Sequence, residues 1–140
     1  MRRLTLTQLS LVNVRNYAAL EFSPVPGLNV LVGANAQGKS NVLEAIGMLG
    51  TGKSFRTAHE SELIRAGLPS ASISGEARLR AGSVRLACTL SAGPGGSRKR
   101  YTVNSQPVRY AGYLGRMRVV TFVPGHLQLV TGAPGLRRAF

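Results

Sequence analysis

Gly33-Ala34-Asn35-Ala36-Gln37-Gly38-Lys39-Ser40 is the stretch that decides the fold, because it matches the pattern G-x-x-x-x-G-K-[ST] of a phosphate-binding P-loop. The glycines let the backbone wrap closely around phosphate and turn its N–H groups inward. Lys39 supplies a mobile cation for the β- and γ-phosphates, and Ser40 offers a hydroxyl to Mg²⁺. A helix that begins here points its positive end at the bound anion. The stretch therefore predicts a nucleotide site.

The residues on either side of the loop support this interpretation. Residues 28–32 form an apolar run that is bounded by Pro26-Gly27, and they predict a buried strand. Residues 41–49 carry apolar side chains at helical spacing, and they predict an amphipathic helix. Those apolar positions are Val42, Leu43, Ile46 and Leu49. Strand, loop and helix is the arrangement that a P-loop requires, whereas the alternative is a glycine-rich turn with a chance lysine.

Length and composition fit one domain with a real core. The chain has 140 residues, of which 44% are hydrophobic. No apolar run approaches the roughly 20 residues that cross a bilayer, and the N-terminal residues do not resemble a signal peptide. The single cysteine, Cys88, lies in an apolar run and is expected to be a small buried side chain. We therefore expect a cytoplasmic protein without a membrane segment.

The charge balance is strongly basic. The formal net charge is +13, with 18 Lys and Arg residues against 5 acidic residues, all of them glutamates. No acidic residue follows Glu76, so eleven basic residues in the second half have no acidic neighbour in the sequence. A field of that sign attracts polyanions, which points to nucleic acid. The alternative is a genomic preference for arginine, with the acidic partners located elsewhere.

The sequence contains no aspartate. A P-loop ATPase normally holds Mg²⁺ with a second acidic group at a strand end, the Walker B aspartate. None of the five glutamates ends an apolar strand downstream of the P-loop. We therefore expect residues 1–140 to be a piece of a longer protein, or to bind nucleotide without turning it over.

The N-terminal residues predict two antiparallel strands ahead of the P-loop. Apolar positions alternate from Leu4 to Val14 with one slip, which predicts a strand with a bulge. Arg15-Asn16-Tyr17 is a polar turn, and residues 18–22 return as the second strand. Simple kinases and GTPases usually begin directly with the P-loop strand, so this arrangement favours an ABC-type ATPase head. In such a head, the turn at Arg15 lies near the nucleotide.

A basic loop, Lys53-Ser54-Phe55-Arg56-Thr57, follows the predicted helix. It is either a solvated connection or a contact to the phosphates of DNA or nucleotide, and both interpretations stay open. Residues 59–66 predict a short helix that Gly67 ends. His59 is interpreted as a polar residue near the helix start, because no Cys or Asp lies at metal spacing from it.

A β-rich stretch comes next, with strands predicted at residues 71–80, 84–91 and 98–103. Period-two alternation places five arginines on one solvent face: Arg78, Arg80, Arg85, Arg98 and Arg100. Such a face either follows a phosphate backbone or is simply solvated. Residues 110–117 predict a helix, and residues 118–123 predict a final buried strand that Pro124 ends.

Four stretches of the sequence resemble the RecF family, bacterial recombination-mediator ATPases that are related to SMC heads. The first is the P-loop with its helix, at residues 33–46. The others are Val14-Arg15-Asn16-Tyr17, the basic loop with its preceding glycine at residues 52–57, and residues 132–140. They agree with the family in order and spacing over essentially all 140 residues. Asn35-Ala36-Gln37 and the basic loop are more specific than a generic P-loop.

The resemblance implies the first lobe of an ABC-type ATP-binding head, an α/β P-loop NTPase fold with parallel core strands and an antiparallel β subdomain. We expect residues 1–140 to form this one lobe, in a protein more than twice as long. The Walker B strand, the signature motif and a coiled-coil-like insertion would follow Phe140. The nucleotide-binding residues would be Gly33, Ala34, Asn35, Ala36, Gln37, Gly38, Lys39, Ser40 and Asn41, with Arg15 and Asn16 as further candidates. The DNA-binding candidates are Lys53 and Arg56.

The resemblance also implies cofactors and partners. ATP with Mg²⁺ would promote a homodimer that binds single-stranded, gapped and double-stranded DNA, and slow hydrolysis would release it. RecR and RecO would be direct partners, RecA would be loaded indirectly, and the SOS response would be supported. The 140-residue chain alone is expected to bind ATP without hydrolysing it, because it lacks the Walker B and signature residues.

The sequence departs from the family at one point, because Gly125-His126 stands where family members have an acidic residue after the proline. Gln128 is either the γ-phosphate-sensing, metal-contacting glutamine of ABC heads or an exposed helix residue. Two other functional classes remain open: another ABC or P-loop ATPase such as a transporter head, and a nucleic-acid-binding module with a relic P-loop.

Overall fold

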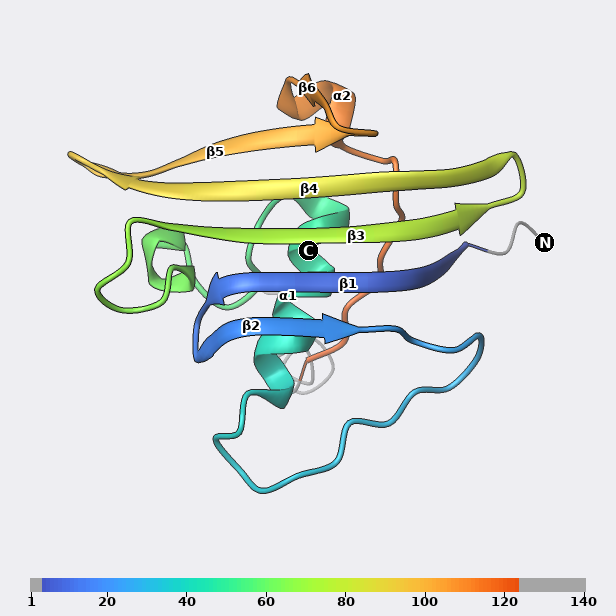
Figure 1. The fold of residues 1–140 in the computed structure, drawn as a ribbon, viewed down its shortest axis with the longest axis horizontal. Coiled ribbons are helices and arrows are strands. Elements are labelled where there is room, and N and C mark those ends of the chain that lie inside the picture. The colour runs from blue at the N-terminus through green and yellow to red at the C-terminus, as the bar shows by residue number, and fades with distance from the viewer. Residues whose placement is uncertain (1–3, 124–140) are drawn as a thin grey trace, which may run out of the picture.

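The computed structural model describes residues 4–123 of the chain. It consists of a six-stranded antiparallel sheet with one helix packed on one face (Figure 1). The strands are β1 Thr5–Val14, β2 Tyr17–Phe22, β3 Ser70–Leu79, β4 Gly82–Gly93, β5 Gly96–Val103 and β6 Gln106–Val108, in the spatial order β2-β1-β3-β4-β5-β6. The helices are α1 Lys39–Thr51, the 3-10 turn η1 Glu60–Leu63 and α2 Tyr110–Tyr113.

The sheet follows from the period-two pattern of its strands. Buried and more exposed residues alternate along β3 and β4, and each hairpin turn has a residue at positive φ, namely Arg15, Gly82, Gly95 or Asn104. The slip predicted in the first strand is real, because the register between β1 and β3 shifts between Leu6 and Gln8. The strands predicted at residues 71–80, 84–91 and 98–103 are thereby confirmed as β3, β4 and β5, within a few residues.

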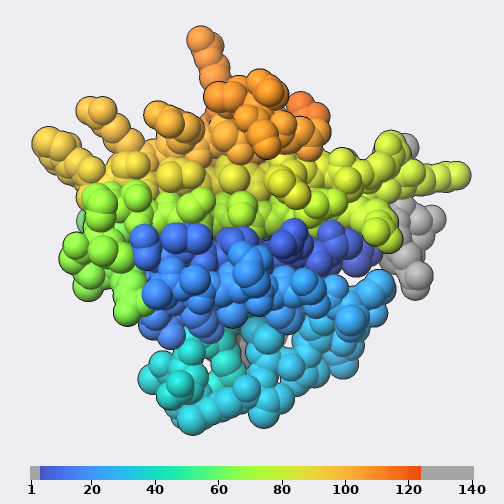
Figure 2. All heavy atoms as spheres, viewed as in Figure 1, coloured from blue at the N-terminus to red at the C-terminus, as the bar shows by residue number. Residues whose placement is uncertain are grey.

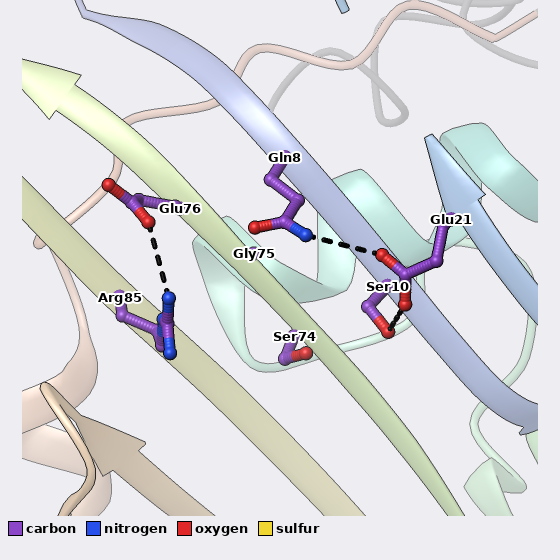
Figure 3. A pocket seen from close by; sticks show the side chains of 7 residues that line it. All are labelled: Gln8, Ser10, Glu21, Ser74, Gly75, Glu76 and Arg85. Atoms are coloured by element: carbon purple, nitrogen blue, oxygen red, sulfur yellow. Dashed lines mark hydrogen bonds and ion pairs between the residues drawn. The ribbon is translucent and has the colours of Figure 1, made fainter. Parts of the chain in front are cut away.

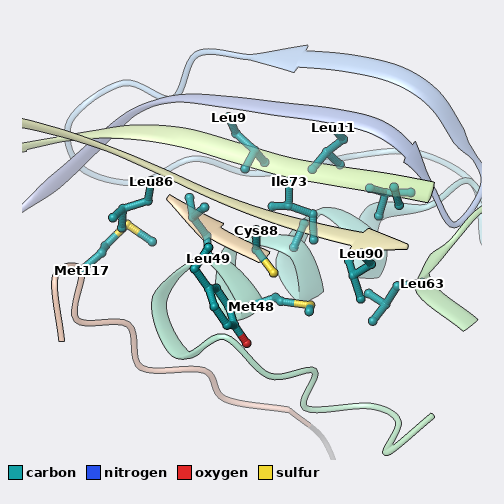
Figure 4. Close-up of a cluster of buried hydrophobic side chains, with 14 of the residues drawn as sticks. Leu9, Leu11, Met48, Leu49, Leu63, Ile73, Leu86, Cys88, Leu90 and Met117 are labelled. Carbon is teal, nitrogen blue, oxygen red and sulfur yellow. The ribbon is translucent and has the colours of Figure 1, made fainter. Parts of the chain in front are cut away.

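The hydrophobic core lies between the sheet and α1 (Figure 4). The sheet contributes Leu9, Leu11, Ile73, Leu86, Cys88 and Leu90, and the other elements contribute Met48, Leu49, Leu63 and Met117. The contact between helix and sheet is close at Gly75, where an added Cβ would lie 2.6 Å from Cδ2 of Leu49. Cys88 is fully buried, as the sequence predicts, and burial raises the pKa of its thiol to about 12.

Three tyrosines and a lysine hold the C-terminal end of α1 to β5 and α2. The hydroxyl of Tyr113 donates to the carbonyl of Leu49 at 2.7 Å, and that of Tyr110 donates to Thr51 at 2.9 Å. The carbonyl of Gly52 accepts hydrogen bonds from Tyr101 at 3.2 Å and from Lys99 at 2.8 Å. These bonds satisfy carbonyls that the end of a helix leaves without intrahelical partners.

Two predicted strands are wrong. Residues 28–32 and 118–123 form no strand, and Val32 and Val120 are 88% and 97% exposed. A buried parallel strand needs strands beside it. In the described part of the chain the strand pairs are all antiparallel, and none of them involves residues 28–32 or 118–123. The parallel core strands of the predicted head are therefore absent from residues 4–123, whereas its antiparallel subdomain is present. Figure 1 shows the segment before α1 looping out beyond the β2 edge.

Smaller predictions need correction too. The helix expected at residues 59–66 is only the 3-10 turn η1, and that expected at residues 110–117 is only α2. Within α1, Leu43 is 52% exposed, whereas Glu44 is fully buried. The hydrogen bonds that Glu44 accepts from other segments make this burial possible. Gly125, His126, Gln128 and residues 132–140 lie outside the described residues.

No helix within residues 4–123 is long and apolar enough to cross a membrane.

Candidate nucleotide-binding site

The P-loop is held in shape where it meets the turn between β1 and β2. Gly38 has a φ of +99° and caps α1, a conformation that glycine adopts without steric cost. An added Cβ there would lie 2.6 Å from Oδ1 of Asn16 and 2.9 Å from the hydroxyl of Tyr17. The second glycine of the motif is therefore required by its φ and by the closeness of the turn.

Lys39 folds back over the loop that precedes it. Its Nζ donates to the carbonyls of Gly33 and Ala34, both at 2.6 Å. An ammonium has three donors, so one remains for an additional acceptor. The lysine therefore places a positive charge at the loop, next to the N-terminus of α1, where the helix dipole also favours an anion.

An open pocket of about 370 Å³ lies in front of the loop and the first turn of α1. Its lining residues are Asn35, Ala36, Gly38, Lys39, Ser40, Asn41 and Arg56. Six of these belong to the predicted nucleotide-binding stretch, and the seventh comes from the basic loop. Two cations, a helix N-terminus and an exposed hydroxyl at Ser40 are the groups that a polyphosphate with Mg²⁺ needs, so the donor set fits that ligand.

Behind the pocket, Glu44 holds three segments together. Arg15 donates to its carboxylate through Nε at 3.0 Å and through Nη2 at 2.8 Å. Ser54 of the basic loop donates a further hydrogen bond, and Nη1 of Arg56 lies 3.3 Å from Oε2. Because α1, the turn after β1 and the basic loop meet at this carboxylate, their relative positions are fixed.

Burial of Glu44 disfavours its charged form, which would raise the pKa of the carboxyl. The hydrogen bonds from Arg15 and Ser54, together with the charges of Arg15 and Arg56, outweigh this effect. The pKa of Glu44 therefore lies below its usual value, and the group is ionised at neutral pH. Sequence analysis missed this residue; the available signal was a glutamate one turn after Ser40, inside an apolar helix pattern.

Asn16 and Asn41 extend the network to the loop itself. The side-chain amide of Asn41 donates to Oδ1 of Asn16 at 2.8 Å, and that of Asn16 donates to the carbonyl of Gln37 at 3.3 Å. Arg56 donates to Oδ1 of Asn41 at 2.6 Å. The structure thus brings Asn16 and Asn41 together under the P-loop.

The remaining predicted residues are placed as follows. The guanidinium of Arg15 is turned toward Glu44 and toward the carbonyl of Glu62, which accepts from it at 3.2 Å. Arg56 lines the pocket, but Lys53 is exposed at the other end of α1, with its Nζ 6.0 Å from the centre of the Tyr110 ring. The two cations of the basic loop therefore face different surroundings.

Within residues 4–123, no group of three or more His, Cys, Asp or Glu side chains is placed to hold a metal. His59 immediately precedes η1, as expected for a polar residue near a helix start. Ser40 remains the predicted Mg²⁺ ligand. The possible second contact, Gln128, lies outside the described part of the chain.

Comparison with known proteins decides the family. Residues 8–110 match the family model described as AAA domain, which is most of the chain. The chain belongs to the AAA domain family. This match covers the P-loop, α1, the basic loop and the sheet as far as β6.

Among the individual proteins similar to this chain, the relatives described below are RecF proteins. The chain is 43% identical to the DNA replication and repair protein RecF of Lacticaseibacillus casei strain BL23, over 96% of this chain and 36% of the relative. It is 41% identical to RecF of Geobacillus thermodenitrificans strain NG80-2, with the same coverage. The chain thus spans about a third of the length of these relatives.

A structure described as the recombination mediator protein RecF-ATPrS in the RecFOR pathway matches with a TM-score of 0.85 and 29% identity, over 97% of this chain and 36% of that chain. The SMC head domain from Thermotoga maritima matches with a TM-score of 0.62 and 23% identity, over 76% of this chain and 40% of that chain, which shows a common fold. The resemblance to the N-terminal part of RecF is confirmed, and so is the ABC-type head lobe.

Proposed function

We propose that this chain is the ATP-binding lobe of a DNA replication and repair protein of the RecF kind. The observation that carries the proposal is the pocket in which the P-loop, Ser40 and Arg56 meet. The RecF relatives and the structure described as RecF-ATP support the choice of nucleotide and of biological process.

The chain's own residues would hold ATP in a defined way. The N–H groups of the loop and of the first turn of α1 would contact the phosphates, and Lys39 would exchange its carbonyl contacts at Gly33 and Ala34 for phosphate oxygens. Ser40 would hold Mg²⁺, which neutralises charge on the β- and γ-oxygens when it is bound. Asn35, Ala36 and Asn41 would shape the walls, whereas Gln37 lines a neighbouring pocket. Arg15 and Asn16 would support the site from below.

The basic loop is the proposed link between nucleotide and DNA. Arg56 lies at the pocket and is fixed by Asn41 and Glu44, whereas Lys53 lies at the far end of α1. Both were predicted as DNA contacts and both keep that proposed role. Because Ser54 also binds Glu44, a shift of Arg56 toward phosphate would be transmitted to the whole loop.

At the level of the whole protein, the proposal includes an ATP-dependent homodimer on single-stranded, gapped or double-stranded DNA. It includes RecR and RecO as partners, indirect loading of RecA and support of the SOS response, all in the cytoplasm. For this chain alone, we propose ATP binding without turnover, since within residues 4–123 no acidic strand end faces the pocket.

Filter binding of labelled DNA, with and without Mg-ATP, tests the proposal. Retention of DNA that Mg-ATP increases, and that Lys39→Ala makes independent of Mg-ATP, is the expected result. ATP binding without any DNA retention would favour another ATPase head, such as a transporter nucleotide-binding domain. DNA retention that ignores Mg-ATP would favour a nucleic-acid module with a relic P-loop.

A further inference from the structure

The face of the sheet turned away from α1, here called the outer face, is the one seen in Figure 2. Alternation gives its centre short side chains, including Ser10, Ser72, Ser74, Thr89 and Ser91. Among the described residues, Val12 is the only large exposed apolar side chain on this face, at 45%. Such a surface lacks the contiguous apolar patch that typically marks a protein interface.

Three arginines lie at one edge of the outer face, and we call them the β5–β6 basic edge: Arg98, Arg100 and Arg109. Alternation along β5 turns Arg98 and Arg100 outward, whereas Lys99 points inward and pairs with Glu60 at 2.7 Å. Arg109 directly follows β6, whose residue Val108 pairs with Tyr101, so it lies beside the position of Arg100. In Figure 2, long side chains project from this gold and orange edge.

The positive charge of this edge is not neutralised by its neighbours. Within residues 4–123, no carboxylate lies within ion-pair distance of Arg98, Arg100 or Arg109. The two glutamates of the outer face are elsewhere, around a polar hollow over β1 and β3 (Figure 3). There Glu76 pairs with Arg85 at 3.4 Å, and Glu21 accepts hydrogen bonds from Gln8 and Ser10.

Geometry favours a regular phosphate backbone as the partner. Outward side chains on one strand repeat about every 6.8 Å. This spacing is comparable to the separation of neighbouring phosphates on one DNA strand, which wind about the axis as they rise about 3.4 Å each. Arg98 and Arg100 can therefore contact phosphates on the same DNA strand without bending it. Arg109, beside Arg100 across the sheet, would add a third contact.

The absence of stacking groups favours duplex over single-stranded DNA. Proteins that bind single strands typically stack the bases on aromatic side chains. The aromatic residues of β5 and α2 point the other way, because Tyr101 and Tyr113 are 7% and 1% exposed and hydrogen-bond to the end of α1. On β2, Tyr17 and Phe22 pair with the inward residues Val14 and Leu9. No aromatic side chain of the described strands therefore faces outward.

We propose that the β5–β6 basic edge binds the phosphate backbone of duplex DNA independently of base sequence. This inference rests on the proposed DNA-binding function and assigns a surface to it. Because Lys99 lies between Arg98 and Arg100 and binds the carbonyl of Gly52, the same strand that contacts DNA also contacts the end of the P-loop helix.

Fluorescence anisotropy with a labelled 20-base-pair duplex tests the inference on the 140-residue chain. The test variant is Arg98→Ala/Arg100→Ala, and the matched control is Arg78→Ala/Arg80→Ala, which removes the same charge at the opposite end of the sheet. We expect the test variant to weaken duplex binding about tenfold and to reduce the slope of log K against log salt by about 1.8, since each phosphate contact contributes about 0.9. We expect the control to change the slope by less than about 0.5.

Four results would overturn the inference in whole or in part. Equal effects of the two variants would mean that duplex affinity depends on net charge alone and not on this edge. No effect of either variant would place the DNA-binding surface elsewhere. In both cases the proposed DNA-binding function stands. A 20-nucleotide single strand that binds as tightly as the duplex, and loses as much in the test variant, would overturn the preference for duplex. If the unchanged chain binds no duplex but still binds ATP, both the inference and the DNA part of the proposed function are wrong.

Discussion

The antiparallel sheet and the segment that leads into the P-loop both contain apolar residues that predict strands, but the two regions differ in structure. Residues of β3 such as Ile73 are fully buried, whereas Leu28 and Val32 are 86% and 88% exposed. Four of the five neighbouring strand pairs are consecutive hairpins, and the fifth joins β1 to β3 across β2, α1 and η1. The segment at residues 28–32 has no such neighbour in the described part of the chain. An apolar run predicts a strand only where another strand can accept its hydrogen bonds.

The first prediction tests this difference with the same substitution in both regions. Leu11→Ala removes a fully buried side chain from the core, and Leu28→Ala removes an exposed one. We expect Leu11→Ala to lower the free energy of unfolding by about 3 kcal/mol, because a cavity remains. We expect Leu28→Ala to change it by less than about 0.5 kcal/mol. Urea denaturation followed by circular dichroism measures both, and equal effects would contradict the exposure of residues 28–32.

The second prediction concerns Glu44, which joins the sheet side of the molecule to the pocket. Glu44→Gln leaves Arg15 and Arg56 without their carboxylate. We expect the free energy of unfolding to fall by about 2 kcal/mol, because Glu44 is buried but both arginines are partly exposed to solvent. The matched control, Glu21→Gln on the exposed outer face, should cost less than about 0.5 kcal/mol.

Acid provides an independent check on Glu44. Its pKa is lowered by folding, so its stabilising contribution is present above the usual pKa of a glutamate and is lost as the pH falls through the lower folded value. The difference in unfolding free energy between the unchanged chain and Glu44→Gln should therefore shrink below about pH 4. A difference that stays constant from pH 7 to pH 3 would show that the carboxylate charge plays no part.

The third and smallest effect concerns the anchoring of α2. Tyr113→Phe removes a buried hydroxyl that donates to the carbonyl of Leu49, and we expect a cost of about 1 kcal/mol. Tyr110→Phe removes the more exposed bond to Thr51 and should cost about half as much. Urea denaturation of both variants measures these costs. A larger loss of unfolding free energy in Tyr110→Phe than in Tyr113→Phe would contradict the greater burial of the Tyr113 hydroxyl.

The predictable parts of the structure were those that local sequence determines. Alternation located β1, β3, β4 and β5 and their outward arginines, and G-x-x-x-x-G-K-[ST] located the loop and α1. The strands at residues 28–32 and 118–123 were mispredicted because parallel pairing depends on distant partners. Helical spacing alone placed Leu43 inside and gave no role to Glu44, because a buried carboxylate depends on arginines that come from other segments.

The candidate site was predictable in its residue types but not in its arrangement. The motif identified Lys39 and Ser40, yet it did not indicate that Arg56 lies at the pocket while Lys53 lies at the other end of α1. Both residues belong to one basic loop, and their separation arises from the hydrogen bonds of Arg56 to Asn41 and Glu44. Those contacts join residues 12 and 15 positions apart, beyond the reach of a local pattern.

Isothermal titration of Mg-ATP into the chain tests the central claim most directly, with Lys39→Ala as the variant and Arg80→Ala as a control that also removes one positive charge. The unchanged chain and Arg80→Ala should bind one nucleotide with the same affinity. Lys39→Ala should weaken binding by about 3 kcal/mol, roughly a hundredfold, because the phosphates lose a charged donor at the loop. Unchanged affinity in Lys39→Ala would contradict the assignment of this pocket to nucleotide.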